Sequence, residues 1–399
     1  MPVEPSTVIR EYAGSGVLDF SDGTDSRCQF VARQYSNGDI ILECLHDDHG
    51  AAHLIVGSGP PPTKFRGQTD GQRPLVIDGP FLTVHASIGS HQGTKTRHVC
   101  AQTELRLADE WSAEAIVTFD LTNLFLWPEE QRPRTDGPGT SGVIVLRVAG
   151  RELVLRRGPD HEGIREHLRE HHGCAITASL ETRVTGRDEL DPVIAVVDRV
   201  CALLSLARGT LVTWLYYEIA TQTREHISSY GRYAKTKDYC GSELIESNRR
   251  GETSGFVHQV YERYAEIEAT FEMLRVIHAR LDVNEGAFLE ARGLVGAALV
   301  EYLASAYARE FGSVADRSAS LTDKLALMCK ALHGGFEAKE IRAVGRTRNH
   351  LAHRLRFASS DPYVEHSKLT NFLDVILLRL LGYSGPYVDC RTWERKVLQ

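Results

Sequence analysis

The chain has 399 residues, of which 42% are hydrophobic and 25% are charged, and its formal net charge is −7. This balance is that of an ordinary folded protein, and it excludes a largely disordered, collagen-like or rod-like coiled-coil chain. No apolar run approaches the roughly 18–20 residues that a membrane span requires, and the N-terminus lacks the basic start and apolar stretch of a secretory signal. We therefore expect a cytoplasmic protein of two or three domains with no membrane partner.

The net charge and the cysteine pattern limit how the protein can bind nucleic acid and whether it contains disulfides. An acidic chain is not globally adapted to nucleic acid, so any RNA contact requires a local basic patch. The eight cysteines include no CxxC pair, which is typical of scattered free thiols in a cytosolic protein.

Short β-rich runs separated by turn residues fill the first 185 residues. Asn37-Gly38-Asp39 before Ile40 is a hairpin signal, and a second hairpin is expected around Ala149-Gly150-Arg151. The sequence pattern predicts further strands over residues 74–79 and 81–85. Strands at this spacing indicate a sandwich or an open antiparallel sheet. The proline-rich and polar residues 57–73 and 128–141 are expected to be mobile loops.

Helical spacing replaces the β pattern near Asp191. A helix is expected over residues 193–207 and ends at Gly209; a strand over 210–219 and a polar loop over 224–251 follow. Five further helices are expected over residues 256–281, 284–311, 321–332, 336–357 and 364–381, with Ser320 as the cap of the third and Gly382 after the last. The sequence therefore predicts an α+β fold: a β-rich N-terminal domain over 1–185, a connection over 186–251, and an all-α bundle over 252–399.

One charged side chain lies on the apolar face of the fourth predicted helix of this bundle. On a helical wheel of about 100° per residue, an apolar stripe falls within about 60° of Arg348; its members are Ile341, Val344, Leu351, Ala352 and Leu355. Removing a guanidinium from water costs several kcal/mol, so Arg348 requires a carboxylate, a phosphate or a solvent-filled cleft as its partner. His350 lies about 200° away and is expected to face solvent.

Asn349 and His353 lie four residues apart on the flank of that stripe. Imidazole transfers protons near neutral pH, an amide orients a phosphate or hydroxyl, and arginine grips phosphate oxygens. These are the groups required to cleave RNA through the ribose 2′-hydroxyl without a metal or another cofactor. One histidine cannot readily serve as both base and acid, whereas a two-fold pair of these helices supplies two.

The pattern Arg348-Asn349-x-x-x-His353 resembles the R-N-x-x-x-H motif of HEPN domains, in the penultimate helix where that family carries it. The closing stretch Leu373–Tyr383 is similar to the C-terminal helix of the ApeA-like branch, and the resemblance extends over about residues 284–387. That branch joins a β-rich N-terminal domain to a C-terminal HEPN domain. The resemblance implies a metal-independent endoribonuclease that acts in bacterial anti-phage defence as a homodimer or higher oligomer.

The resemblance also assigns roles. Arg348 takes the phosphate-binding role, Asn349 the polar position after it and His353 the catalytic one. Many family members carry a facing acidic residue on the first long helix; Glu301 and Glu290 are the candidates here, and small neighbours such as Ala297 favour Glu301. Arg346, Arg354 and Arg356 add positive charge that suits the backbone of a tRNA or mRNA substrate. A phage-derived trigger at the N-terminal domain completes the expected partners.

Other readings stay open. The domain can instead be a non-catalytic HEPN module for dimerisation or nucleic-acid binding, or a scaffold or antitoxin-like partner of another enzyme. Two histidine-rich stretches invite a metal hypothesis; they contain Cys44, His46, His49 and His53, and His161, His167, His171, His172 and Cys174. Neither has a second half at zinc-finger spacing, so we expect loop histidines and no metal site.

Overall fold

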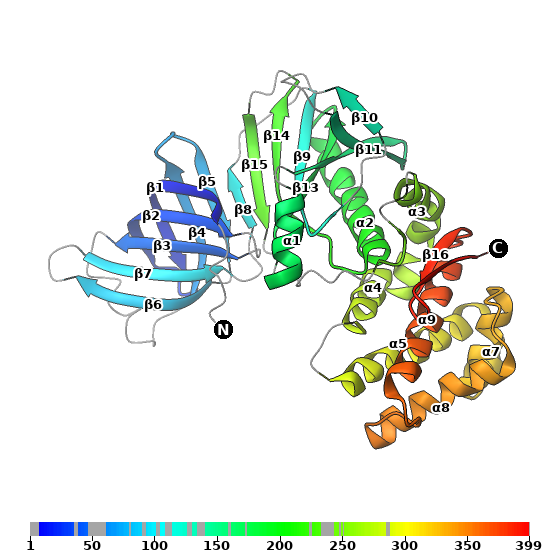
Figure 1. Cartoon of the computed structure of the whole chain (residues 1–399). Coiled ribbons are helices and arrows are strands. Elements are labelled where there is room, and N and C mark those ends of the chain that lie inside the picture. Colours follow the sequence, from blue (N-terminus) through cyan, green and yellow to red (C-terminus); the bar gives the residue numbers. More distant parts are fainter. Residues whose placement is uncertain are drawn as a thin grey trace. The chain divides into compact units, whose positions relative to one another are not determined.

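The protein is described from a computed structural model of residues 1–399 (Figure 1). The structure describes residues 8–35, 39–46, 61–79, 81–89, 93–100, 104–107, 114–125, 130–133, 140–158, 161–171, 174–222, 226–232, 243–246, 249, 251–284 and 288–398. Among them, no helix combines the length and apolar composition that a membrane crossing requires.

The first 232 residues contain most of the strands. They are β1 (Val8–Phe20), β2 (Asp25–Tyr35), β3 (Ile40–His46), β4 (Pro62–Thr69), β5 (Pro74–Asp78), β6 (Phe81–Gly89), β7 (Gly93–Cys100), β8 (Glu104–Leu107), β9 (Ala115–Thr122), β10 (Glu130–Pro133), β11 (Thr140–Val148), β12 (Arg151–Arg157), β13 (Ile176–Val184), β14 (Trp214–Thr221) and β15 (His226–Arg232). Helices α1 (His161–His171) and α2 (Leu190–Arg208) interrupt them, with a 3-10 turn at Arg187–Glu189 before α2.

The remaining residues are mainly helical. The helices are α3 (Glu252–Phe271), α4 (Met273–Asp282), α5 (Leu289–Phe311), α6 (Val314–Ser318), α7 (Leu321–Ala331), α8 (Ala338–Arg354) and α9 (Pro362–Leu380). A short hairpin of β16 (Pro386–Asp389) and β17 (Glu394–Val397) ends the described chain. The predicted α+β class, with a β-rich N-terminal part followed by helices, is thereby confirmed.

The chain forms two compact units that interleave along the sequence. Unit 1 comprises Met1–Leu124, Leu153–Ile194 and Thr213–Asp238, and unit 2 comprises Phe125–Glu152, Ala195–Val212 and Tyr239–Gln399. In unit 1 the strands form an antiparallel sheet in the order β12-β13-β9-β14-β15-β8-β5-β4-β1-β2-β3-β7-β6. Strands β10 and β11 pair with each other in unit 2.

The N-terminal part of the unit 1 sheet is curved and encloses an apolar core. Side chains alternate along β2, so that Cys28, Phe30 and Ala32 face inward and are buried. Gly16 and Gly67 admit the Phe65 ring, because a Cβ at either position would lie within 2.8 Å of an atom of that ring. The strand β6 returns toward β4, which closes one side of this core.

Several strand predictions are confirmed. The β2–β3 hairpin forms with Gln34 opposite Ile40, although residues 36–38 of its predicted turn lie outside the described residues. Strands β5 and β6 lie at the predicted positions. Strand β11 ends at Val148 and β12 begins at Arg151, and the two residues between them have positive φ, as a tight hairpin turn requires.

Other predictions for this half are wrong. Strand β4 lies within the predicted loop 57–73, and Pro62 is its first residue, where the missing N–H costs nothing to the ladder. Strand β10 lies within the predicted loop 128–141, and β15 within the predicted loop 224–251. Proline and polar residues are typical of loops, but pairing with neighbouring strands decides that these segments form strands.

In unit 2, α5 is the central helix and packs against α4, α7, α8 and α9 (Figure 1). Ser320 caps α7 as predicted, since its hydroxyl accepts a hydrogen bond from the N–H of Asp323. The predicted helix over 256–281 is divided into α3 and α4 at Glu272, which adopts the left-handed conformation with φ of 47°. The short helix α6 and the β16–β17 hairpin are not in the sequence prediction.

Candidate functional site

Helix α8 carries the motif, and residues of α8 itself cap the helix and pack it against its neighbours. Glu337 and Glu340 form a reciprocal capping box at its N-terminus, and acidic residues suit that end of the helix dipole. Ile341, Val344 and Leu351 are buried on one face, as the wheel predicts. The helix packs against α5, where the glycine at position 293 admits Leu351 and the Phe357 ring.

Arg348 meets a carboxylate from α5. Its Nε and Nη2 donate to one carboxylate oxygen of Glu301 at 2.9 and 2.6 Å. The side chain of Arg348 is 24% exposed and that of Glu301 is 42% exposed. The structure therefore brings Glu301 to the motif, whereas Glu290 makes no hydrogen bond or ion pair with any described residue. The catalytic role of Glu301 stays a prediction.

Asn349 and His353 are exposed to solvent on the same helix, and Asn349 contacts Arg348. The Oδ1 atom of Asn349 accepts a third hydrogen bond from Arg348, through Nη1 at 3.1 Å. His353 is exposed in the last turn of α8. Three polar groups thus lie on one helix, with the guanidinium fixed in orientation and the imidazole accessible.

The helical wheel is wrong at three positions. Leu355 was placed in the buried stripe but is 67% exposed, because α8 ends at Arg354 and Leu355 turns into the left-handed conformation. Ala352 is exposed as well. His350, expected to face solvent, is half-buried, and its Nδ1 is buried without a hydrogen-bond partner among the described residues.

The three additional arginines are separated by the structure. Arg354 and Arg356 are exposed at and just beyond the end of α8. Arg346 is exposed about two turns earlier and lines a groove between α8 and α9. Of the three, Arg346 therefore borders a distinct concave surface.

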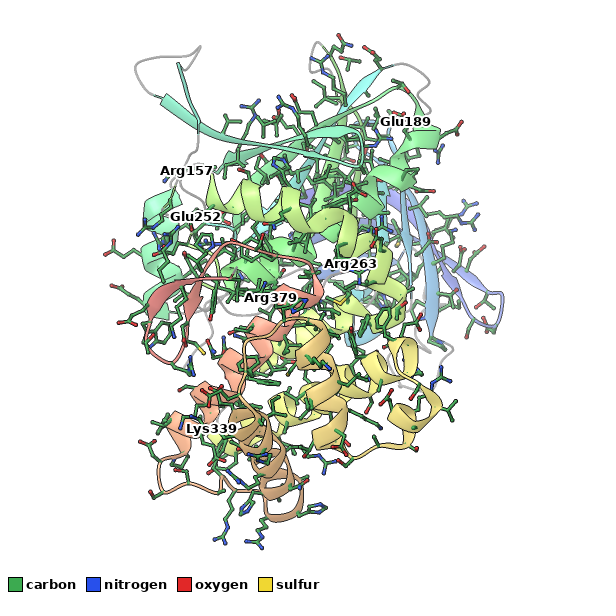
Figure 2. The ribbon with its side chains drawn as sticks, turned by 90° about the vertical axis from the view of Figure 1, so that its right-hand side faces the viewer. Arg157, Glu189, Glu252, Arg263, Lys339 and Arg379 are labelled. Carbon is green, nitrogen blue, oxygen red and sulfur yellow. The ribbon has the colours of Figure 1, made fainter. Side chains whose placement is uncertain are left out.

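That groove has a cavity volume of about 550 Å³. Phe336 and Phe372 provide apolar lining, and Lys339, which Figure 2 labels on α8, is one of its cationic residues. Asn371 lies in the lining, and its buried Oδ1 has no hydrogen-bond partner among the described residues. This groove was not predicted, because its residues come from α8, α9 and the segments around them and form no contiguous pattern.

The described histidines of the two histidine-rich stretches lie on a helix and a strand, and not in loops as expected. His161, His167 and His171 lie on α1, so they are helical and not loop histidines, and the side chain of His167 is exposed. His49, His53 and His172 lie outside the described residues. His46 is the last residue of β3 and is fully buried beside Cys44 and beside His98 of β7.

His98 is the residue that the sequence analysis missed in this cluster. Burial first, and the nearby His46 second, lower the pKa of His98 to about 4, so its imidazole is neutral at pH 7. The available signal was the alternation of Thr94, Thr96 and His98, which places all three on one face of a strand. A thiol and two imidazoles are groups that can hold a transition-metal ion.

The comparisons with known proteins concern another part of the chain. A family model described as the YopA central domain matches residues 112–237, which span β9 to β15 together with α1 and α2. Searches among curated proteins and among solved structures gave no significant match. The matched segment ends before α3, so it does not include the site on α8.

Proposed function

We propose that the chain is a HEPN-type, metal-independent endoribonuclease that acts in bacterial anti-phage defence. The observation that carries the proposal is that half-buried Arg348 lies on one helix with exposed Asn349 and His353, and that Glu301 orients its guanidinium. Asn349 and His353 are exposed on α8, so packing of the helix does not account for them. The anti-phage role rests on the family resemblance.

The chemistry follows from the groups present. An imidazole removes the proton of the ribose 2′-hydroxyl, and the resulting oxygen attacks the adjacent phosphorus. Arg348 stabilises the additional negative charge on the phosphoryl oxygens. A second imidazole protonates the departing 5′-oxygen, which leaves a 2′,3′-cyclic phosphate and a 5′-hydroxyl. Since His353 is the one exposed histidine of α8, His353 of a second subunit is assigned the second proton transfer.

Glu301 has a positioning role in this scheme. It holds two of the guanidinium nitrogens, so that the orientation of Arg348 is set before RNA arrives. A phosphate that binds Arg348 competes with this carboxylate. The ion pair therefore lowers the affinity of the guanidinium for an RNA phosphate.

The first prediction is RNA cleavage in the presence of EDTA. The full chain is incubated with a mixture of tRNA and mRNA, and the termini of the products are determined. We expect 2′,3′-cyclic phosphate and 5′-hydroxyl ends from the wild type and no cleavage by His353→Ala or Arg348→Ala. His167→Ala, which removes an exposed histidine of α1, is the matched control and should cleave normally.

Both variants are expected to fold. His353 is exposed, so its removal costs little stability. Arg348→Ala leaves Glu301 with access to water, so we expect a change below about 1 kcal/mol. Cleavage of 2′-deoxy substrate, activity that EDTA abolishes and magnesium restores, or full activity of both variants would contradict the proposal and favour a binding or scaffold module.

A further inference from the structure

A cluster of polar side chains lies inside the curved N-terminal sheet of unit 1. Strands β3 and β7 pair with Cys44 opposite Thr96 and His46 opposite Thr94, and side chains alternate along each strand. Cys44, His46 and His98 therefore face the same interior and are at most 3% exposed. One potential ligand atom from each of the three lies within 4.8 Å of the others.

Hydrogen bonds fix how the two imidazoles point. The Oγ atom of Ser26 lies 2.8 Å from Nδ1 of His46. Nε2 of His46 and Nε2 of His98 each lie 2.8 Å from the same hydroxyl oxygen, that of Thr96. The two Nε2 atoms thus converge on the hydroxyl of Thr96, while the hydroxyl of Ser26 holds the other ring nitrogen of His46. Metal-binding histidines typically have such an outer hydrogen-bond partner.

The spacing fits a small tetrahedral cation. A zinc ion with bonds of about 2.0–2.3 Å separates its ligand atoms by roughly 3.3–3.8 Å, which requires only a modest contraction of this cluster. Thr94, directly opposite His46, is fully buried, and its Oγ1 has no hydrogen-bond partner among the described residues. Thr94 therefore provides a polar oxygen on the same interior face of the sheet as the three ligands.

A hydroxyl–imidazole network alone is the competing explanation. It accounts for Ser26, Thr96 and the two histidines, which satisfy one another by hydrogen bonds. It leaves the Oγ1 atom of Thr94 without a hydrogen-bond partner among the described residues, whereas a metal ion would use the thiol of Cys44 and both rings together. The ring of Phe81 packs edge-to-face against His98 at 6.2 Å between centroids, so the site is enclosed on an apolar side.

We propose that Cys44, His46 and His98 bind one zinc ion that joins β3 to β7 inside unit 1. The thiol loses its proton to become the thiolate ligand, both imidazoles bind in the neutral form, and an oxygen of a threonine or of water completes the tetrahedron. Because the ligands come from two strands separated by about fifty residues of chain, the ion stabilises the folded sheet. This site is independent of the proposed ribonuclease chemistry in unit 2.

The test uses the full chain and measures metal directly. After dialysis against a slight excess of Zn²⁺ and then against metal-free buffer, we expect one zinc per chain in the wild type and in Cys329→Ser. Cys329 is a buried cysteine of α7, so this variant is the matched control. Cys44→Ser and His98→Gln should lose at least nine-tenths of the bound zinc.

Cobalt substitution in the wild type keeps the test decisive if those variants fail to fold. Bound Co²⁺ should show the intense visible bands of a tetrahedral site together with a thiolate-to-cobalt charge-transfer band. The chelated wild type should also unfold at a lower temperature than the zinc-loaded protein. Absence of bound zinc in the folded wild type, retention of zinc by both ligand variants, or a cobalt spectrum without thiolate ligation would each overturn the proposal.

Discussion

Arg348 shows what a single residue in a sequence can reveal. Its position in an apolar stripe predicts an oppositely charged partner, because a buried guanidinium is costly without one. Glu301 provides that partner. His350 shows the limit of the same method, since the wheel describes one helix and the burial of His350 depends on what packs around it.

The buried cluster in unit 1 was beyond sequence reasoning for a related reason. His46 was grouped with His49 and His53, its neighbours in the chain. Its neighbour in space, His98, is 52 positions away and is brought close by the pairing of β3 with β7. Proximity along the chain is a poor guide to ligand sets that are built across a sheet.

We expect the ionisation of a single residue, Asp120 of β9, to make the stability of the fold depend on pH. Its carboxylate lies 3.4 Å from Arg10 of β1, and Arg10 also pairs with Glu218 of β14 at 3.2 Å. Burial raises the pKa of Asp120 to about 6 from an ordinary 3.8, despite the opposing effect of Arg10. Because the folded state holds its proton more tightly than the unfolded state, this group stabilises the fold below about pH 4. That stabilisation is lost as the pH rises through 6.

The second prediction is that Asp120→Asn removes this dependence. Relative to the wild type, the variant should gain up to roughly 3 kcal/mol in free energy of unfolding between pH 4 and pH 8. Urea unfolding at several pH values, followed by the aromatic signal of the adjacent Trp214 and Tyr217, measures the difference. A constant offset between variant and wild type at all pH values would show that the carboxyl group does not titrate in this range.

At the scale of elements, helices were easier to predict than strands. Apolar spacing of three and four residues is local, so α2, α5, α7, α8 and α9 were found within a few residues of their ends. Strands β4 and β10 were read as loops because what stabilises them is the neighbouring strand. The break at Glu272 has no proline or glycine to signal it.

Helix α4 is joined to α9 by a buried ion pair. Arg280 donates to Asp374 through Nη2 at 2.9 Å, and the two side chains are 7% and 2% exposed. Removal of one partner leaves the other charge in a low-dielectric interior, which typically costs about 3–5 kcal/mol. The pair therefore makes the packing of these two helices sensitive to a single substitution.

The third prediction compares two arginines of α4. Arg280→Ala should lower the free energy of unfolding by about 3–5 kcal/mol. Arg275→Ala, which removes an 81% exposed arginine paired with Glu272, should lower it by less than about 1 kcal/mol. Urea unfolding followed by helical circular dichroism measures both. Equal effects of the two substitutions would show that burial of the Arg280–Asp374 pair is not what holds α4 in place.

At the scale of the whole molecule, the two units interleave along the chain. Residues 125–152 and 195–212 belong to unit 2, although the segments on either side of each belong to unit 1. A boundary drawn from a change in pattern divides a chain into consecutive pieces, so it cannot express this arrangement. The composition of each segment indicates its secondary structure, while the assignment to a unit depends on tertiary packing.

The proposed chemistry requires two histidines on opposite sides of one phosphorus, so it also requires two subunits to assemble. A two-fold axis near His353 supplies both and brings two Arg348 side chains together. Each of these is already paired with a Glu301, which relieves their repulsion. Leu355 and Tyr363 are 67% and 73% exposed in the stretch that follows the motif, so apolar side chains are available there for the proposed contact.

The fourth prediction is a two-fold homodimer in which α8 of each subunit faces the other across an interface larger than about 1,000 Å². Tyr363→Glu should give a monomer and reduce RNA cleavage at least tenfold, because a charge in that contact opposes association while the motif is unchanged. Leu274→Glu is the matched control, since Leu274 is also an exposed apolar side chain in the first turn of a helix. Sedimentation and cleavage are measured on the same samples. A strictly monomeric wild type that cleaves RNA at full rate would exclude the shared cleft, because one His353 would then have to perform both proton transfers.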